Sequence, residues 1–161
     1  MSERPRSVSA MDAFRLPERL AARLPGRLGE LGDRLQVRLQ IAPEVLPVGL
    51  PFLCLQPLVE NAVRHGLASK PNGGTITITA ENAGAECVII VEDDGIGMDP
   101  KRLREDLEDA HLSGAHVGLG NVDDRMRSTF GDDFGLVVDT NVGAGMKITL
   151  RVPKFRVGIR V

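Results

Sequence analysis

The chain of 161 residues carries 20 Lys and Arg side chains against 22 Asp and Glu, a formal net charge of -2. This length suffices for one compact α/β domain and is too short for two domains of ordinary size. The balanced charge offers no basic surface for nucleic-acid phosphates, so nucleic acid is not expected as a partner. The sequence has neither a membrane-spanning apolar run nor a secretory signal. We therefore expect a cytoplasmic domain without membrane insertion, in a parent protein that can itself be membrane-anchored.

The first half of the chain predicts a leader, a strand and a helix. Residues 1–33 are rich in Pro, Gly and Arg, which indicates a partly helical leader or linker. Arg34–Ile41 alternates polar and apolar residues, which is typical of a strand with one buried face. Leu50–His65 carries a broad apolar stripe at helical spacing, with Gly66 as a stop signal. We expect Pro57 to bend or divide this helix.

The second half predicts two hairpins separated by helices. Four strands and two helices are expected: Thr75–Thr79, Val88–Val91, Leu136–Thr140 and Met146–Val152, with helices at Pro100–Asp109 and Asn121–Phe130. This order predicts an α/β fold in which a mixed sheet carries its helices on one face. The domain is expected over residues 34–153, followed by a tail at 154–161. Cys54 and Cys87 each lie in an apolar run, which indicates buried reduced thiols.

Polar residues interrupt the apolar helix pattern within Leu55–Gly66. Asn61, Arg64 and His65 are three and four residues apart, so they are predicted to share one helical face. An amide oxygen can bind Mg²⁺ without adding charge, and a guanidinium one turn later can hold phosphate oxygens. The alternative is an amphipathic helix whose polar stripe is only solvated.

Three Gly-containing segments follow, and each has a structural alternative. In Val91–Met98, an acid at the end of a buried strand can accept a hydrogen bond from an exocyclic amine, and glycines let the backbone pass beneath a flat base; ordinary turns share this pattern. In Gly114–Asn121, glycines before a helix can offer amides to phosphates. Asn121 with Asp124 equally resembles a capping box. Gly143–Gly145 alone could be only a hairpin turn.

Together these segments resemble the N, G1, G2 and G3 boxes of the ATPase superfamily that unites gyrase, the heat-shock chaperone, histidine kinases and MutL. More narrowly, residues 32–153 resemble the catalytic domain of LytS-type sensor kinases. The Leu55–Gly66 run is the most specific part, and Val117–Val122 and Gly145–Pro153 add to the similarity. The resemblance implies a two-layer α/β sandwich of the Bergerat type, which binds ATP and Mg²⁺ beneath a mobile lid, expected here at residues 110–118.

The resemblance also implies roles for individual residues. Asn61 would be the magnesium ligand, acting in catalysis with Arg64, and Asp93 would accept the adenine amine. Gly95 and Gly97 would form the floor of the base pocket. The full nucleotide-binding set implied is Asn61, Arg64, His65, Asp93, Gly95, Gly97, Met98, Gly118, Leu119, Gly120 and Asn121, with Gly118 and Gly120 as lid glycines facing the phosphates.

The chain departs from the family pattern at three points. His116 stands where the G2 box usually begins with Gly, and Met146 stands where the family commonly has Thr after the last Gly. The acceptor motif Pro-His-Phe is absent, and none of His65, His111 and His116 lies in such a context. His65 is instead expected to line the nucleotide pocket.

The leading functional hypothesis is a phosphotransferase that delivers the γ-phosphoryl group of ATP to a histidine on a separate dimerisation segment of the parent kinase, with a response regulator downstream. A gyrase-type hydrolase is the second, but Pro57 occupies the place of its catalytic Glu. Glu60 is expected to point about 100° away from Asn61 around the helix. A third hypothesis is a nucleotide-binding switch or anti-sigma-like module without kinase activity.

Overall fold

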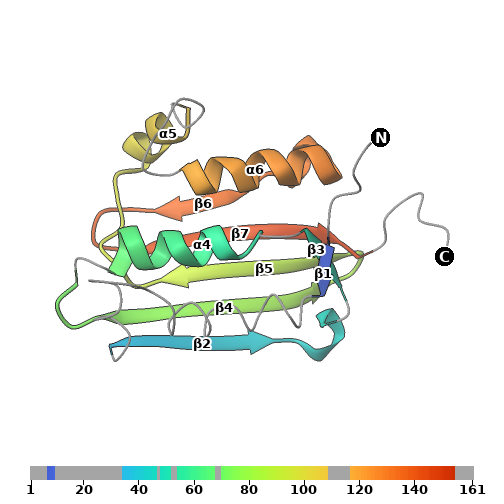
Figure 1. Cartoon of the computed structure of the whole chain (residues 1–161), viewed down its shortest axis with the longest axis horizontal. Coiled ribbons are helices and arrows are strands. Elements are labelled where there is room, and N and C mark those ends of the chain that lie inside the picture. The colour runs from blue at the N-terminus through green and yellow to red at the C-terminus, as the bar shows by residue number, and fades with distance from the viewer. Residues whose placement is uncertain are drawn as a thin grey trace.

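The structure, a computed structural model, describes residues 7–9, 34–46, 48–51, 54–67, 70–108 and 117–154. Its main feature is a five-stranded sheet with the strand order β2-β4-β5-β7-β6 (Figure 1). The strands are β2 (Leu35–Ile41), β4 (Gly74–Ala83), β5 (Glu86–Asp93), β6 (Val137–Thr140) and β7 (Met146–Pro153). β2 pairs in parallel with β4, and the other three pairings are antiparallel. The predicted mixed sheet and both predicted hairpins are confirmed.

The predicted buried face of β2 is only partly buried. Leu35, Val37 and Ile41 are half-buried, whereas the Leu39 side chain is 40% exposed. The reason is position, because β2 is one of the two edge strands of the sheet. In a separate two-stranded sheet, β1 (Ser7–Ser9) pairs with β3 (Gly49–Pro51). The remaining leader residues and the tail after residue 154 lie outside the described residues.

The first predicted helix begins later and ends later than expected. Leu50 belongs to strand β3, and α4 spans Gln56–Asn61. Pro57 lies in its first turn, where a missing N–H is tolerated, so it neither bends nor divides the helix. The chain continues as a π-helical segment, η2 (Ala62–Leu67), so the predicted stop at Gly66 is wrong. A methyl group on Gly66 would meet the Asp93 carboxylate at 2.6 Å, which explains the glycine as a packing requirement.

The two later helices lie between β5 and β6 in the chain. α5 spans Pro100–Glu108, as predicted. α6 spans Val117–Phe130 and therefore begins four residues before the predicted Asn121. Asn121 lies in the second turn of α6, so the predicted role of Asn121 as a helix cap is wrong. Within the described stretches, no helix is long and apolar enough to cross a bilayer.

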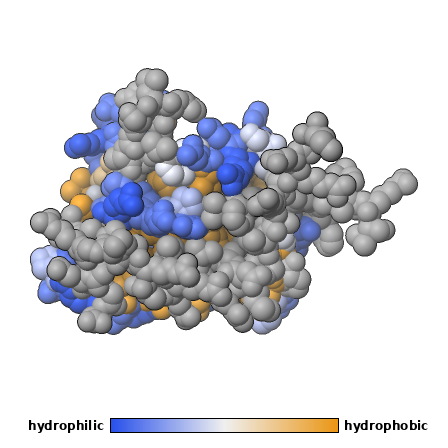
Figure 2. Space-filling model, in the orientation of Figure 1, coloured by the Kyte–Doolittle hydropathy of each residue, from blue (hydrophilic) through white to orange (hydrophobic). Residues whose placement is uncertain are grey.

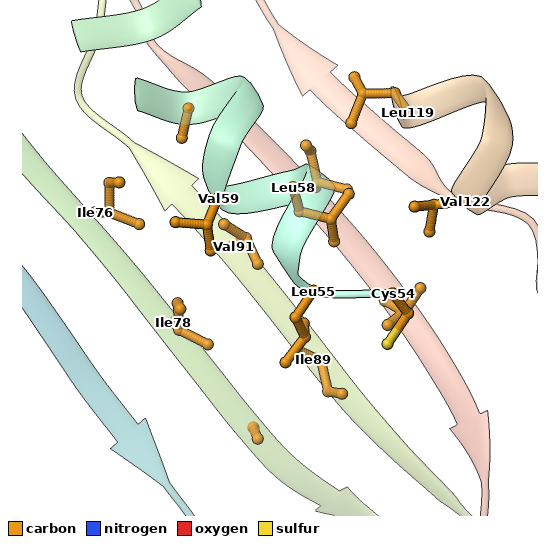
Figure 3. Close-up of a cluster of buried hydrophobic side chains, with 14 of the residues drawn as sticks. Cys54, Leu55, Leu58, Val59, Ile76, Ile78, Ile89, Val91, Leu119 and Val122 are labelled. Atoms are coloured by element: carbon orange, nitrogen blue, oxygen red, sulfur yellow. The ribbon is translucent and has the colours of Figure 1, made fainter. Parts of the chain in front are cut away.

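The core lies between one face of the sheet and the helices. Side chains from α4 and the residues before it face Ile76 and Ile78 of β4 and Ile89 and Val91 of β5, and α6 contributes Leu119 and Val122 (Figure 3). Both cysteines are buried free thiols, as predicted. In Figure 2, hydrophobic surface shows in small patches beside hydrophilic residues on the described part of the face viewed. This arrangement is the predicted two-layer α/β sandwich, in which strand and helix ends meet at one edge of the core.

Candidate functional site

A cavity of about 420 Å³ opens where η2, the end of β5, α5 and the β6–β7 turn meet. Its lining residues are Asn61, His65, Gly66, Asp93, Ile96, Gly97, Met98, Asp99, Arg102, Asp106, Val142 and Met146. These residues come from segments up to 85 positions apart in the chain, since Asn61 and Met146 contact each other across that separation. The cavity is therefore a product of the fold and has the size of a small-molecule site.

Asp93 lines this cavity because the strand pattern places it there. On β5 it follows Ile89 and Val91 on the buried face, and in the register it lies between Ile76 of β4 and Met146 of β7. A carboxylate thus continues an apolar row. Its Oδ1 accepts a hydrogen bond from the Gly95 backbone N–H at 2.9 Å.

Burial makes the Asp93 carboxyl a weaker acid than usual. Desolvation is the largest effect and raises the pKa of Asp93 to about 6. The hydrogen bond from the Gly95 N–H is the next largest effect and lowers the pKa. The charge of Asp94 raises the pKa further, and the charge of Lys70 lowers it. A half-buried carboxyl that accepts hydrogen bonds from the Gly95 and Met146 backbone N–H groups keeps acceptor capacity for a ligand, so Asp93 can recognise a polar N–H donor in the cavity.

Close backbone packing forms the floor beneath Asp93. Ile96 N–H donates to the Gly66 carbonyl at 3.1 Å, and Gly143 N–H donates to the Ile96 carbonyl at 2.7 Å. A side chain on Gly95 would collide with the backbone of Gly66. Gly97 has φ 60°, and a side chain there would collide with the Asn141 carbonyl. The glycines at 95 and 97 are therefore required by contacts that hold the cavity floor together.

Asn61 joins this cavity to a second, smaller one. It is the last residue of α4 and is only 7% exposed, and its Nδ2 donates to the Met146 sulfur at 3.4 Å. The smaller cavity, of about 120 Å³, is lined by Pro57, Glu60, Asn61, Arg64, His65, Gly118 and Leu119. It lies between α4 and the first turn of α6. Asn61, Arg64 and His65, which were predicted to share one helical face, all border this cavity.

The first turn of α6 supplies backbone amides near this smaller cavity. A methyl group on Gly118 would lie 3.3 Å from the Pro57 side chain, so the two helices approach closely there. The N-terminal amides of a helix carry a partial positive charge that favours anions. These amides and the Arg64 guanidinium can attract an anion in the cavity between α4 and α6, whose lining also contains the Glu60 carboxylate.

The predicted site residues fall into three groups. Asn61, His65, Asp93, Gly97 and Met98 line the main cavity, and Gly118 and Leu119 border the smaller one with Arg64. Gly95 lies in the floor. Gly120 and Asn121 line a third cavity, of about 470 Å³, with residues of α5 and β6. The predicted lid at residues 110–118 and the side chains of His111 and His116 lie outside the described residues, Gly118 and the Val117 backbone excepted.

Several lining residues were not predicted from the sequence. Arg102 and Asp106 are four residues apart on α5, and Asp99 precedes the helix by one position. This spacing was a usable signal, because it places two charged side chains on one helical face next to the Gly-containing loop. Ile96 and Val142 are 45% and 74% exposed at the cavity, and nothing in their local sequence pattern marks them as neighbours.

Residues 49–156 match the family described as Histidine kinase-, DNA gyrase B-, and HSP90-like ATPase. The chain belongs to this ATPase family. Sensor histidine kinases are among its relatives: BtsS of Escherichia coli K12 is 35% identical over 104 residues, which cover 65% of this chain and 17% of BtsS. YesM of Bacillus subtilis 168 is also 35% identical over 104 residues, and LytS of Oceanobacillus iheyensis is 30% identical over 108. The ATPase domain thus spans less than a fifth of each of these relatives.

Solved structures show the same fold. The Acinetobacter baumannii histidine kinase AdeS superimposes with a TM-score of 0.67 at 15% identity, covering 97% of this chain and 70% of that one. The catalytic domain of histidine kinase ThkA also gives a TM-score of 0.67 at 15% identity, covering 92% of this chain and 97% of that one. The fold of the ATPase domain is therefore that of histidine kinase catalytic domains.

Proposed function

We propose that this chain is the Mg-ATP-binding catalytic domain of a LytS-type sensor histidine kinase. The observation that carries the proposal is the half-buried Asp93 carboxyl in the lining of the main cavity. Adenine presents an exocyclic amine as a donor to such an acceptor, whereas guanine presents a carbonyl oxygen at the equivalent ring position. Two acceptors facing each other in a buried site repel, so Asp93 favours adenine.

The residues present also fit the phosphates and a divalent ion. The smaller cavity combines the Asn61 amide, the Arg64 guanidinium and the first turn of α6. Among the described residues, no group of three or more His, Cys, Asp or Glu side chains is placed to hold a metal alone. A bound Mg²⁺ would thus be shared between Asn61 and phosphate oxygens, where it would neutralise charge on the phosphates. Arg64 would orient the phosphate chain.

Phosphoryl transfer requires an acceptor outside this site. We propose a histidine on a dimerisation segment of the parent kinase: its ring nitrogen bonds to the γ-phosphorus as the bond to the ADP oxygen breaks. A response regulator would then receive the phosphoryl group. Pro57 at the position of the gyrase-type catalytic Glu supports transfer over hydrolysis. Glu60 borders the smaller cavity beside Asn61 and Arg64, where its carboxylate accepts a hydrogen bond from Gln56 Nε2 at 2.9 Å. A switch module without kinase activity is the alternative.

Two measurements test the proposal. Calorimetry with ATP and GTP, with and without Mg²⁺, should show magnesium-dependent binding of ATP and at least about tenfold weaker binding of GTP. Radiolabelled ATP should label a histidine-bearing dimerisation segment when it is added, and should not label the chain alone. Well-folded protein that binds no nucleotide would refute the proposal, and brisk phosphate release by the chain alone would move it to the hydrolase class. Binding without transfer to any added segment would favour the switch module.

A further inference from the structure

Met146 occupies a position next to both of the chemically important side chains of the site. It is the first residue of β7, where the resemblance leads one to expect Thr, and it lines the main cavity while being only 7% exposed. The register of the sheet places it directly opposite Asp93. Its sulfur accepts the hydrogen bond from Asn61 Nδ2.

A thioether restricts the orientation of its partner in a way that a hydroxyl does not. A thioether sulfur has no hydrogen and can only accept a hydrogen bond, whereas a Thr hydroxyl can both donate and accept. A hydroxyl could therefore pair with either end of the Asn61 carboxamide. A sulfur can pair only with the NH₂ end. Since the oxygen and nitrogen of a carboxamide lie on opposite sides of its carbon, the Met146 contact turns the Asn61 oxygen away from β7.

We infer that Met146 is a positioning residue for magnesium: by accepting from Asn61 Nδ2, it presents the Asn61 Oδ1 to a divalent ion held with the nucleotide phosphates. This inference rests on the proposed function. Asn61 lines both cavities, so its carboxamide stands between the space proposed for the base and the space proposed for the phosphates. The contact is buried on both sides, which protects a weak acceptor from competition with water.

A purely structural role for Met146 is the competing explanation, because it also belongs to the hydrophobic core. Met146→Leu separates the two roles. Leucine has a similar volume and no acceptor, so it keeps the packing and removes the hydrogen bond. Met98→Leu is the matched control, since Met98 lines the same cavity and is not the hydrogen-bond partner of Asn61 Nδ2.

The first measurement needs no nucleotide. In the NMR spectrum of the free protein, the Asn61 side-chain amide, assigned from its loss in Asn61→Asp, should exchange with solvent slowly in wild type and in Met98→Leu. In Met146→Leu it should exchange at least about tenfold faster. Exchange in wild type as fast as that of exposed Asn side chains would overturn the inference without any variant, even if Met146→Leu failed to fold.

The second measurement is the ratio of the ATP dissociation constants without and with saturating Mg²⁺. Met146→Leu should reduce this magnesium enhancement about three- to tenfold, the range expected for one modest hydrogen bond. A change in packing at the cavity wall would alter both constants alike and cancel in the ratio. Met98→Leu should change both constants by the same factor and keep the ratio. An unchanged ratio in Met146→Leu would overturn the inference while leaving ATP binding intact. Absence of any ATP binding by wild type would instead refute the proposed function.

Discussion

Replacing Asp93 by Asn should stabilise the fold at neutral pH while weakening ATP binding. Asp93 is an acid placed on the apolar face of β5, and its pKa is raised from 3.8 to about 6, chiefly by desolvation. Asn has nearly the same shape and can still accept the Gly95 N–H through its oxygen. It has no charge to bury, and its NH₂ group would face the adenine amine as a second donor.

The sign and size of the effect follow from proton linkage. Below pH 3.8 the carboxyl is protonated in both states and has no effect on the pH dependence. Between pH 3.8 and about 6 the unfolded chain loses the proton and the folded protein retains it, so the free energy of unfolding falls as pH rises. At about 1.4 kcal/mol per pH unit, this interval corresponds to at most about 3 kcal/mol. Since Asp93 retains some contact with solvent, we expect about 1 to 2 kcal/mol.

The assay is urea unfolding of wild type and Asp93→Asn at intervals from pH 4 to 8. The difference in free energy of unfolding, variant minus wild type, should rise between pH 4 and about 6 and stay constant above. Asp139→Asn removes the same charge from an exposed position on β6 and serves as the control for net charge. A difference that is flat with pH, or that falls as pH rises, would show that burial of the Asp93 charge does not destabilise the fold.

Three further predictions concern other parts of the site. Asn61→Ala should abolish the magnesium dependence of ATP binding measured by calorimetry, while nucleotide without metal still binds. Gly97→Ala should destabilise the fold by more than about 2 kcal/mol in urea unfolding, because it adds a backbone collision to an unfavourable φ; Gly84→Ala, at φ 70° with nothing within 4 Å, should cost about 1 kcal/mol. Residues 110–118 should exchange hydrogen more slowly once ATP is bound, and equal protection in both states would contradict a lid.

The sheet could be predicted from the sequence because its signal is local. Alternation in β4 and β7 reports one buried face directly, and the turns between paired strands contain glycines. The mixed character of the sheet followed from the order of elements. The exposure of Leu39 could not be predicted in this way, since alternation reveals which residues share a face and not whether that strand lies at the edge.

The helix boundaries depended on contacts between distant residues. The start of α6 reads Val-Gly-Leu-Gly, a poor helix former by propensity, yet Leu119 is 1% exposed and Gly118 packs against Pro57 of α4. Burial of Leu119 and close approach of the two helices outweigh the local preference. Leu50 continued an apolar run and so extended the predicted helix, but β3 pairs with β1 some 40 positions earlier in the chain.

The site residues also differ in whether the sequence alone could predict them. Asn61 and Asp93 could be predicted because polar residues interrupting apolar patterns are visible in one dimension. The contact between Asn61 and Met146 could not, because only the pairing of β5 with β7 brings Met146 opposite Asp93 and beneath α4. The positions of Arg102, Asp106 and Val142 in the cavity wall could not be predicted either, because they depend on how α5 and the β6–β7 turn lie over that edge of the sheet.

The features that open the cavity also work against the stability of the fold. An apolar residue at position 93 would complete the row formed by Ile89 and Val91, and it would remove both the desolvated acid and the acceptor for a base. A side chain at Gly66 would occupy the place of the carboxylate itself. Core packing alone would favour an apolar residue at position 93, so an acid there is consistent with the proposed recognition of a ligand, whereas Gly66 is required by its contact with that acid.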